Sequence, residues 1–192
     1  MNSITIKDVA KHAGVSIATV SRVINRNYYV SDEIKEKVLL AIKELNYYPN
    51  SVARSLKSDT TYTIGFLVSD ISNNYFTSMA KAIEDILNKE KYNIIVCSTE
   101  DSKDKELQYL KLLAGKKIDG LILNTTGKND EFISTLSQSL PVVLVNRKIQ
   151  NSGFIGDFID SSNGEGAYIL TSHLISSGHR KIAIINGDLG VS

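Results

Sequence analysis

Residues 5–25 read TIKDVAKHAGVSIATVSRVIN, and this stretch decides the fold of the amino-terminal part of the chain. Four apolar residues in it recur at the spacing of one helical face: Ile6, Val9, Ala10 and Ala13. Thr5 suits the N-cap of this helix, with Asp8 in capping-box position three residues later. Gly14 ends the helix as a C′ glycine, and Ser16 can cap a second one. The stretch therefore predicts two short helices joined by a tight turn.

Two further apolar patterns complete a small helical unit. The second helix carries its apolar face at Val20, Val23 and Ile24. Ser31 can cap a third helix, whose apolar face is formed by Ile34, Val38, Ala41 or Ile42, and Leu45. Three short helices with a tight turn between the first two predict a helix-turn-helix over residues 1–46. In that motif the second helix enters the major groove of DNA.

The outward side chains of the second helix suit base recognition. Arg22 can donate a forked pair of hydrogen bonds to guanine, and Ile17 and Ala18 can contact a thymine methyl group. Short hydrogen-bonding side chains suited to phosphate surround them: Thr5, Ser16, Thr19, Ser21 and Asn25. Helix spacing alone leaves open a generic helical bundle with a polar surface.

Composition and charge exclude several protein classes. The 192 residues include 22 Lys and Arg and 21 Asp and Glu, a net charge of +1, which excludes a uniformly basic coat protein. Residues 1–60 hold nine basic and six acidic residues, so a mildly basic head precedes a mildly acidic body. Cys97 is the only cysteine, which excludes an intramolecular disulfide and a cysteine zinc cage. The sequence shows no signal peptide and no apolar run long enough to span a bilayer, so we expect a cytoplasmic protein without a membrane partner.

Residues 47–61 are expected to form a hinge helix and a linker. Pro49 interrupts the preceding pattern, and residues 51–57 read as a helix of about two turns, which is marginal alone in water. Its apolar stripe is formed by Val52, Ala53 and Leu56. The stripe either packs on the rest of the protein or folds on binding and inserts Leu56 into the minor groove.

The remaining residues alternate between strand and helix patterns. The sequence predicts strands over 62–68, 93–98, 118–123, 142–145 and 154–159, the last at an edge. It predicts helices over 74–91, 103–114 and 129–139. This alternation is typical of a parallel sheet with helices on both faces.

Polar and aromatic residues follow these strands at the end where open parallel sheets bind ligands. They are Ser69, Asp70, Asn73, Tyr75, Phe76, Asn124, Thr125, Thr126, Asn146 and Arg147. Such a set would suit a sugar or a nucleobase, although ordinary loop polarity without a ligand gives the same pattern. The sequence contains no phosphate-binding loop and no nucleophile elbow, and its histidines have no metal-ligand spacing. We therefore expect no enzyme, no cofactor and no metal site.

The run over residues 5–25, continued by Val30-Ser31 and by residues 45–50, closely resembles the lactose-repressor (LacI/GalR) family of bacterial transcription regulators. The resemblance implies that Ile17, Ala18 and Arg22 read bases. It implies phosphate contacts from Thr5, Ser16, Thr19, Ser21, Asn25, Tyr29, Ser31, Tyr47 and Asn50. It also implies hinge helices paired from two subunits, which place Ala53, Arg54 and Leu56 in the minor groove.

The resemblance extends to the body. It implies a periplasmic-binding-protein-like effector subdomain over 62–160, with effector contacts from Tyr75, Asn146 and Arg147 among others. Asp70 and Phe76, which follow the first predicted strand, are added to the expected effector contacts. Residues 161–192 resemble the opening of a second subdomain, with a helix over 163–177 and a strand over 181–186. We interpret the chain as incomplete in that subdomain, and we therefore expect a weakened homodimer and no tight binding of a sugar or purine.

The sequence thus predicts a repressor of carbohydrate-use genes that binds a palindromic operator in double-stranded DNA, with a small-molecule effector in a full-length relative. One alternative is a periplasmic-type sugar-binding transport protein, which the helix-turn-helix and the absence of a signal peptide disfavour. The other is an architectural DNA binder. An enzyme would rest on fold analogy alone.

Overall fold

The computed structural model describes residues 4–25, 28–48, 60–149 and 152–185. The chain divides into two compact units, Met1–Ser58 and Asp59–Ser192, which we call the head and the body.

Three helices form the head: α1 (Ile6–Ala13), α2 (Ile17–Asn25) and α3 (Asp32–Glu44). Each contributes two buried residues to one core: Val9, Ala10, Val20, Val23, Val38 and Ala41. Gly14 has a φ of 66°, the left-handed conformation that lets the chain turn sharply between α1 and α2. The predicted helical faces and the helix-turn-helix arrangement are therefore confirmed.

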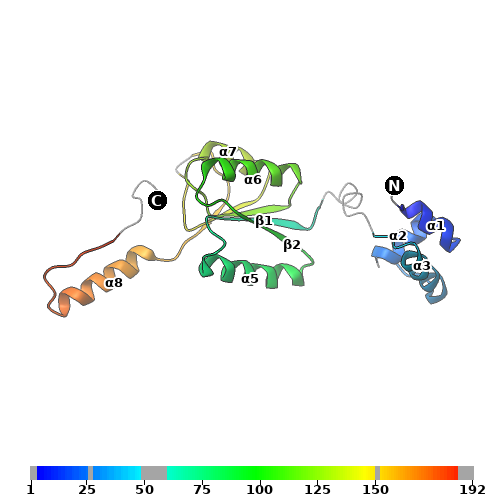
Figure 1. The fold of residues 1–192 in the computed structure, drawn as a ribbon, viewed down its shortest axis with the longest axis horizontal. Coiled ribbons are helices and arrows are strands. Elements are labelled where there is room, and N and C mark those ends of the chain that lie inside the picture. Colours follow the sequence, from blue (N-terminus) through cyan, green and yellow to red (C-terminus); the bar gives the residue numbers. More distant parts are fainter. Residues whose placement is uncertain (1–3, 26–27, 49–59, 150–151, 186–192) are drawn as a thin grey trace. The chain divides into compact units, whose positions relative to one another are not determined.

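The body is built on one parallel sheet. Its elements, in chain order, are β1 (Thr63–Val68), α5 (Asn74–Lys89), β2 (Asn93–Ser98), α6 (Lys103–Gly115), β3 (Gly120–Leu123), α7 (Asp130–Ser137), β4 (Val142–Val145), β5 (Asp157–Ile159) and α8 (Asn163–Ser176). The strand order is β2-β1-β3-β4-β5, and every neighbouring pair is parallel. Helix α5 covers one face of the sheet, and α6 and α7 cover the other (Figure 1).

The body has a hydrophobic core on each face of the sheet, and strand β1 contributes side chains to both because they alternate between the two faces. Phe66 and Val68 pack with Phe76 of α5, whereas Leu67 packs on the other side with Leu110 and residues of α6 and α7. Gly65 lies under α6: a Cβ atom there would come within 2.9 Å of the Leu113 and Ile118 side chains. A glycine at this position therefore permits the close approach of the helix to the sheet.

Several predicted strands differ from the structure in length: 62–68 begins at Thr63 and 118–123 begins at Gly120, and the two largest differences lie nearer the end of the chain. The predicted strand 154–159 is limited to β5, Asp157–Ile159. The prediction of a strand over 181–186 was wrong for residues 181–185, which are exposed and form no strand, while residue 186 lies outside the described residues. A strand needs a neighbour to accept and donate its ladder hydrogen bonds, and the described sheet pairs only β1 to β5 with one another. Helix α8, which precedes these residues, buries none of its own residues in the described structure.

Candidate nucleic-acid interface and ligand site

The start of α1 is fixed by Thr5 and Asp8. The Asp8 carboxylate accepts hydrogen bonds from the Thr5 backbone N–H at 2.8 Å and from the Thr5 hydroxyl at 2.6 Å. The side-chain hydrogen bond from Thr5, followed by the backbone one, lowers the pKa of Asp8 below its ordinary value. This negative group lies at the positive end of α1, where it stabilises the helix.

The N-terminal end of α2 carries the side chains expected to face DNA. Ser16 Oγ accepts a hydrogen bond from the Thr19 backbone N–H at 3.1 Å, so Ser16 caps the helix as predicted. Val20 and Val23 face the head core, which leaves Ile17, Ala18 and Arg22 exposed on the other side of the helix. An exposed apolar residue, an alanine and an arginine thus occupy one accessible surface, which we call the recognition face.

The residues expected to bind phosphate differ in how accessible they are. Thr5, Ser16, Asn25, Tyr29 and Ser31 are exposed, and Thr19, Ser21 and Tyr47 are half-buried. Asn25 Nδ2 donates to Ser21 Oγ at 3.2 Å, and Tyr47 packs against the head core. Ser31 occupies the N-cap position of α3, but its side chain makes no capping hydrogen bond. Asn50, Ala53, Arg54 and Leu56 of the predicted hinge lie outside the described residues.

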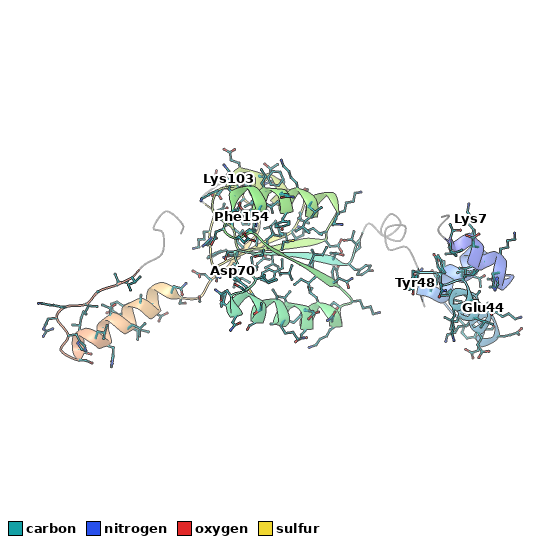
Figure 2. The ribbon with its side chains drawn as sticks, in the orientation of Figure 1. Lys7, Glu44, Tyr48, Asp70, Lys103 and Phe154 are labelled. Carbon is teal, nitrogen blue, oxygen red and sulfur yellow. The ribbon has the colours of Figure 1, made fainter. Side chains whose placement is uncertain are left out.

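Two contacts in the head were not predicted from the sequence. The Arg22 guanidinium lies over the ring of Tyr28, 5.6 Å from its centroid. His12 Nε2 and a Glu44 carboxylate oxygen are 2.7 Å apart, linking the last turns of α1 and α3. Glu44 is labelled at the end of α3 in Figure 2. Both contacts join residues from different helices or loops, so helical periodicity gives no signal for them.

In the body, the strand order reverses between β1 and β3, and the candidate ligand residues lie at the carboxyl ends of the strands around this point. Asp70, after β1, lies at the same end of the sheet as Lys103, which follows β2 (Figure 2). Asp70 accepts hydrogen bonds from Ser72 Oγ and from the Ser72 N–H. These bonds, the side-chain one foremost, lower the pKa of Asp70.

The structure brings Tyr75 and Asn146 together. The Tyr75 hydroxyl donates to Asn146 Oδ1 at 2.9 Å. Asn73 Oδ1 accepts from the Tyr75 N–H and caps α5, so Tyr75 is held at the first turn of the helix. Asn146 has a φ of 65°, a left-handed conformation that asparagine tolerates better than most residues. Phe76 is placed differently: it is only 7% exposed and packs in the core, edge-on to the Tyr75 ring.

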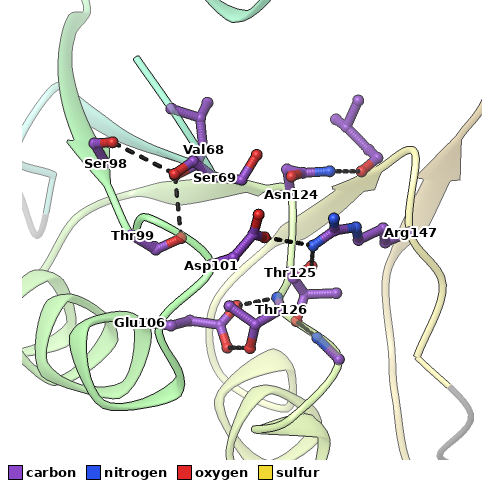
Figure 3. Close-up of polar contacts among 12 residues, drawn as sticks. Val68, Ser69, Ser98, Thr99, Asp101, Glu106, Asn124, Thr125, Thr126 and Arg147 are labelled. Carbon is purple, nitrogen blue, oxygen red and sulfur yellow. Dashed lines mark hydrogen bonds and ion pairs between the residues drawn. The ribbon is translucent and has the colours of Figure 1, made fainter. Parts of the chain in front are cut away.

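Arg147 lies between two acceptors (Figure 3). Its Nη1 donates to an Asp101 carboxylate oxygen at 2.7 Å and to the Thr125 backbone carbonyl at 3.1 Å. Asp101 and the preceding Glu100 both have positive φ, which is costly for residues other than glycine. Sequence reasoning missed Asp101, although it is one of the polar residues that follow β2 at the same edge.

A buried carboxylate lies near this edge of the sheet, and sequence reasoning also missed it (Figure 3). Glu106 of α6 is fully buried and accepts hydrogen bonds from the Thr126 N–H at 2.8 Å, from Thr126 Oγ1 at 2.6 Å and from Asn129 Nδ2 at 2.6 Å. Its position four residues before the core residue Leu110 was the available signal, because residues at that spacing share a helical face. Asn124 Nδ2 donates to the Val145 carbonyl and ties the ends of β3 and β4 together.

Within residues 4–25, 28–48, 60–149 and 152–185, no group of three or more histidine, cysteine or acidic residues could hold a metal ion. No described helix is both long enough and apolar enough to cross a membrane.

Both the head and the body match known protein families. Residues 5–50 match the family described as bacterial regulatory proteins, lacI family. Residues 61–190 match periplasmic binding proteins and the sugar-binding domain of the LacI family. The head and the body therefore match two parts of the same family of regulators.

Individual relatives agree with this assignment. The chain is 44% identical to the ribose operon repressor of Halalkalibacterium halodurans over 98% of its own length and 55% of that protein. It is 42% identical to the transcriptional repressor PurR of Aliivibrio salmonicida, over 96% of this chain and 56% of PurR. The chain thus spans little more than half the length of these relatives.

Among solved structures, the lac repressor dimer bound to operator and the anti-inducer ONPF matches 99% of this chain and 58% of its own, with a TM-score of 0.82 and 27% identity. The relatives are transcription repressors, not enzymes. The predicted fold class, a helix-turn-helix head followed by a periplasmic-binding-protein-like α/β unit, is confirmed. The chain belongs to the lacI family of bacterial regulatory proteins.

Proposed function

We propose that this chain is a sequence-specific DNA-binding regulator, and specifically a repressor of carbohydrate-use genes that acts at a palindromic operator in the cytoplasm. The observation that carries the proposal is the recognition face. Ile17, Ala18 and Arg22 are exposed on the helix that follows a tight turn, while the opposite side of that helix is buried in the head core. A small unit that exposes a base-reading arginine and two apolar contacts on one helix fits the major groove.

The proposed roles divide the contact residues into three sets. Arg22 reads guanine, and Ile17 and Ala18 contact thymine methyl groups. Phosphate contacts come from Thr5, Ser16, Thr19, Ser21, Asn25, Tyr29, Ser31, Tyr47 and Asn50. The hinge residues Ala53, Arg54 and Leu56 enter the minor groove, paired with those of a second subunit. None of these roles is catalytic, and the proposal includes no enzymatic activity.

The test is selection of bound duplexes from a random pool with the 192-residue chain, followed by affinity measurements on the selected site and on random DNA. Arg22→Ala should weaken binding to the selected site by about 1–3 kcal/mol and relax the preference at one base pair. Binding to random DNA should weaken less, because phosphate contacts are retained. An equal loss on both DNAs would show that Arg22 contacts only phosphate.

We propose a second function for the body, the binding of a small polyhydroxylated effector at the carboxyl edge of the sheet. Support comes from the hydrogen bond between Tyr75 and Asn146 and from Arg147, which is held between Asp101 and Thr125. Asp70 completes the proposed contact set, and Phe76, which is buried, contributes only by packing edge-on against the Tyr75 ring. Together these residues offer hydroxyl, amide, carboxylate and guanidinium groups beside the exposed Tyr75 ring, the mixture that sugar hydroxyls and ring faces require.

A panel of pentoses, hexoses and purines, each titrated to millimolar concentration, tests this second function. Amide chemical shifts detect weak as well as tight ligands. A ligand of this site should shift the signals of Tyr75, Asn146 and Arg147 and leave those of exposed Ile86 on α5 unchanged. Arg147→Ala should reduce these shifts. Shifts that spare the three residues would show that the ligand binds elsewhere.

A further inference from the structure

Tyr28 is a large aromatic residue that the head core does not use. It is 72% exposed, and it is absent from the apolar cluster that holds α1, α2 and α3 together. Packing in the head core therefore does not explain why position 28 carries a tyrosine. The side chain does make one contact, with the guanidinium of Arg22, whose central carbon lies 5.6 Å from the Tyr28 ring centroid.

Arg22 lies in the last turn of α2 and forms no ion pair in the part of the chain that the structure describes. An exposed arginine samples many rotamers, and binding to a base edge requires one of them. Contact with the aromatic face, whose negative potential attracts the cation, favours rotamers near the ring. The Tyr28 ring therefore reduces the conformational freedom that Arg22 would otherwise lose on binding.

The two contacts of the guanidinium are geometrically compatible. Arginine donates to guanine O6 and N7 through N–H groups that lie in the guanidinium plane. An aromatic ring contacts the face of that plane, perpendicular to the donors. Contact with the uncharged Tyr28 ring thus leaves the N–H donors of Arg22 available for a base, whereas an ion pair with a carboxylate would occupy them.

We propose that Tyr28 is a positioning residue that sets base specificity by holding the Arg22 guanidinium for guanine recognition. This inference rests on the proposed function, in which Arg22 reads guanine. It assigns to Tyr28 a role in discrimination between bases, exerted through Arg22 and not through a phosphate contact of its own.

The test compares Tyr28→Leu with Tyr28→Phe in the 192-residue chain. Both variants should fold, since the side chain is exposed, and thermal unfolding of the head checks this. Phenylalanine keeps the aromatic face, so Tyr28→Phe should retain affinity for the selected site within about twofold. Leucine removes the face, so Tyr28→Leu should lose about three- to tenfold on the selected site. On random DNA, and on a site in which the guanine is replaced, the loss should stay within about twofold.

A double-mutant cycle with Arg22→Ala separates the outcomes. In the Arg22→Ala background, Tyr28→Leu should have no further effect. If Tyr28→Leu is neutral on the selected site while Arg22→Ala is not, the positioning role is overturned and the proposed function stands. If Tyr28→Leu weakens selected, random and Arg22→Ala binding alike, Tyr28 contacts the DNA backbone directly and the inference is also overturned. If Arg22→Ala itself leaves base preference unchanged, the guanine-reading proposal fails, and the Tyr28 inference fails with it.

Discussion

The hydroxyl of Thr126, just beyond the end of β3, donates a 2.6 Å hydrogen bond to the buried carboxylate of Glu106 in α6. The same carboxylate accepts two more hydrogen bonds, from the Thr126 N–H and from Asn129 Nδ2. One fully buried acidic side chain therefore fixes the segment from Thr125 to Asn129. The carbonyl of Thr125 is in turn an acceptor for Arg147. The position of Arg147 at the proposed ligand site thus depends on a residue that no ligand would touch.

Replacement of Glu106 should destabilise the body. Glu106→Ala leaves the Thr126 hydroxyl, the Thr126 N–H and the Asn129 amide without their acceptor, which should cost about 2–4 kcal/mol. Glu106→Gln retains one acceptor oxygen and should cost less. Urea unfolding followed by circular dichroism measures both values. Gln108→Ala, on the exposed side of the same helix, is the control and should change stability by less than about 0.5 kcal/mol. A similar small change for Glu106→Ala would contradict the stabilising role of the network.

A pair of glycine substitutions tests the packing of α6 on β1. Gly65→Ala places a Cβ 2.9 Å from the Cδ1 atoms of Leu113 and Ile118. Because both side chains are buried in the core and have little room to move, overpacking of this kind should cost about 1–3 kcal/mol. Gly115→Ala, in the last turn of α6, meets no atom within 4 Å and should stabilise the body by about 0.4–1 kcal/mol. The midpoint of urea unfolding should therefore move in opposite directions for the two variants. A shift in the same direction would show that the space around Gly65 does not limit the packing.

Low pH should weaken the head through Asp8. Hydrogen bonds from Thr5 hold the pKa of Asp8 below its ordinary value, so this carboxylate contributes stability above its unfolded pKa and loses that contribution as pH falls through the folded value. The melting temperature of α1, followed by its amide signals, should therefore fall below about pH 4. Asp8→Asn should melt earlier at neutral pH and lose less on acidification, and Thr5→Ala should act in the same direction. Full acid sensitivity in both variants would place its origin at other carboxylates.

Some features of this structure could be predicted from the sequence and others could not. Val9, Val20 and Val38 were assigned to the head core because helical periodicity is a local property of the sequence. The strand pattern around Phe66 and Leu67 is also a local property of the sequence, and its alternation with helix patterns predicted the parallel sheet. Glu106 and Thr126 are 20 residues apart and Tyr75 and Asn146 are 71 apart, so each pairing depends on how the chain closes in space. The sequence placed Tyr75 and Asn146 at one edge of the sheet, but nothing in the pattern predicted their hydrogen bond.

For the strand expected over 181–186 the error is the reverse: the local pattern predicted an element that residues 181–185 do not form. Residues such as Ile182, Ile184 and Ile185 have the β-branched side chains that favour strands, yet all three are exposed and lie in no strand. Strand propensity mainly reflects packing on a sheet, and no described strand pairs with these residues. The apolar pattern alone therefore does not determine whether residues 181–185 form a strand.

The last prediction separates apolar base contact from phosphate contact in the recognition face. Ile17 is 44% exposed beside Ala18 at the start of α2, where its methyl groups can meet the C5-methyl of thymine. Replacing thymine by uracil in the selected site removes that methyl group and changes neither the charge nor the Watson–Crick hydrogen bonds of the base pair. Loss of one buried methyl contact should weaken binding about fourfold at the contacted position. Ile17→Ala should weaken binding to the thymine site by a similar factor and bind the thymine and uracil sites almost equally. Leu39→Ala, at an exposed leucine of α3, is the matched control and should keep the full sensitivity to uracil. If uracil weakens the Ile17→Ala variant as much as the wild-type chain, the methyl group is sensed by another residue or through the shape of the DNA.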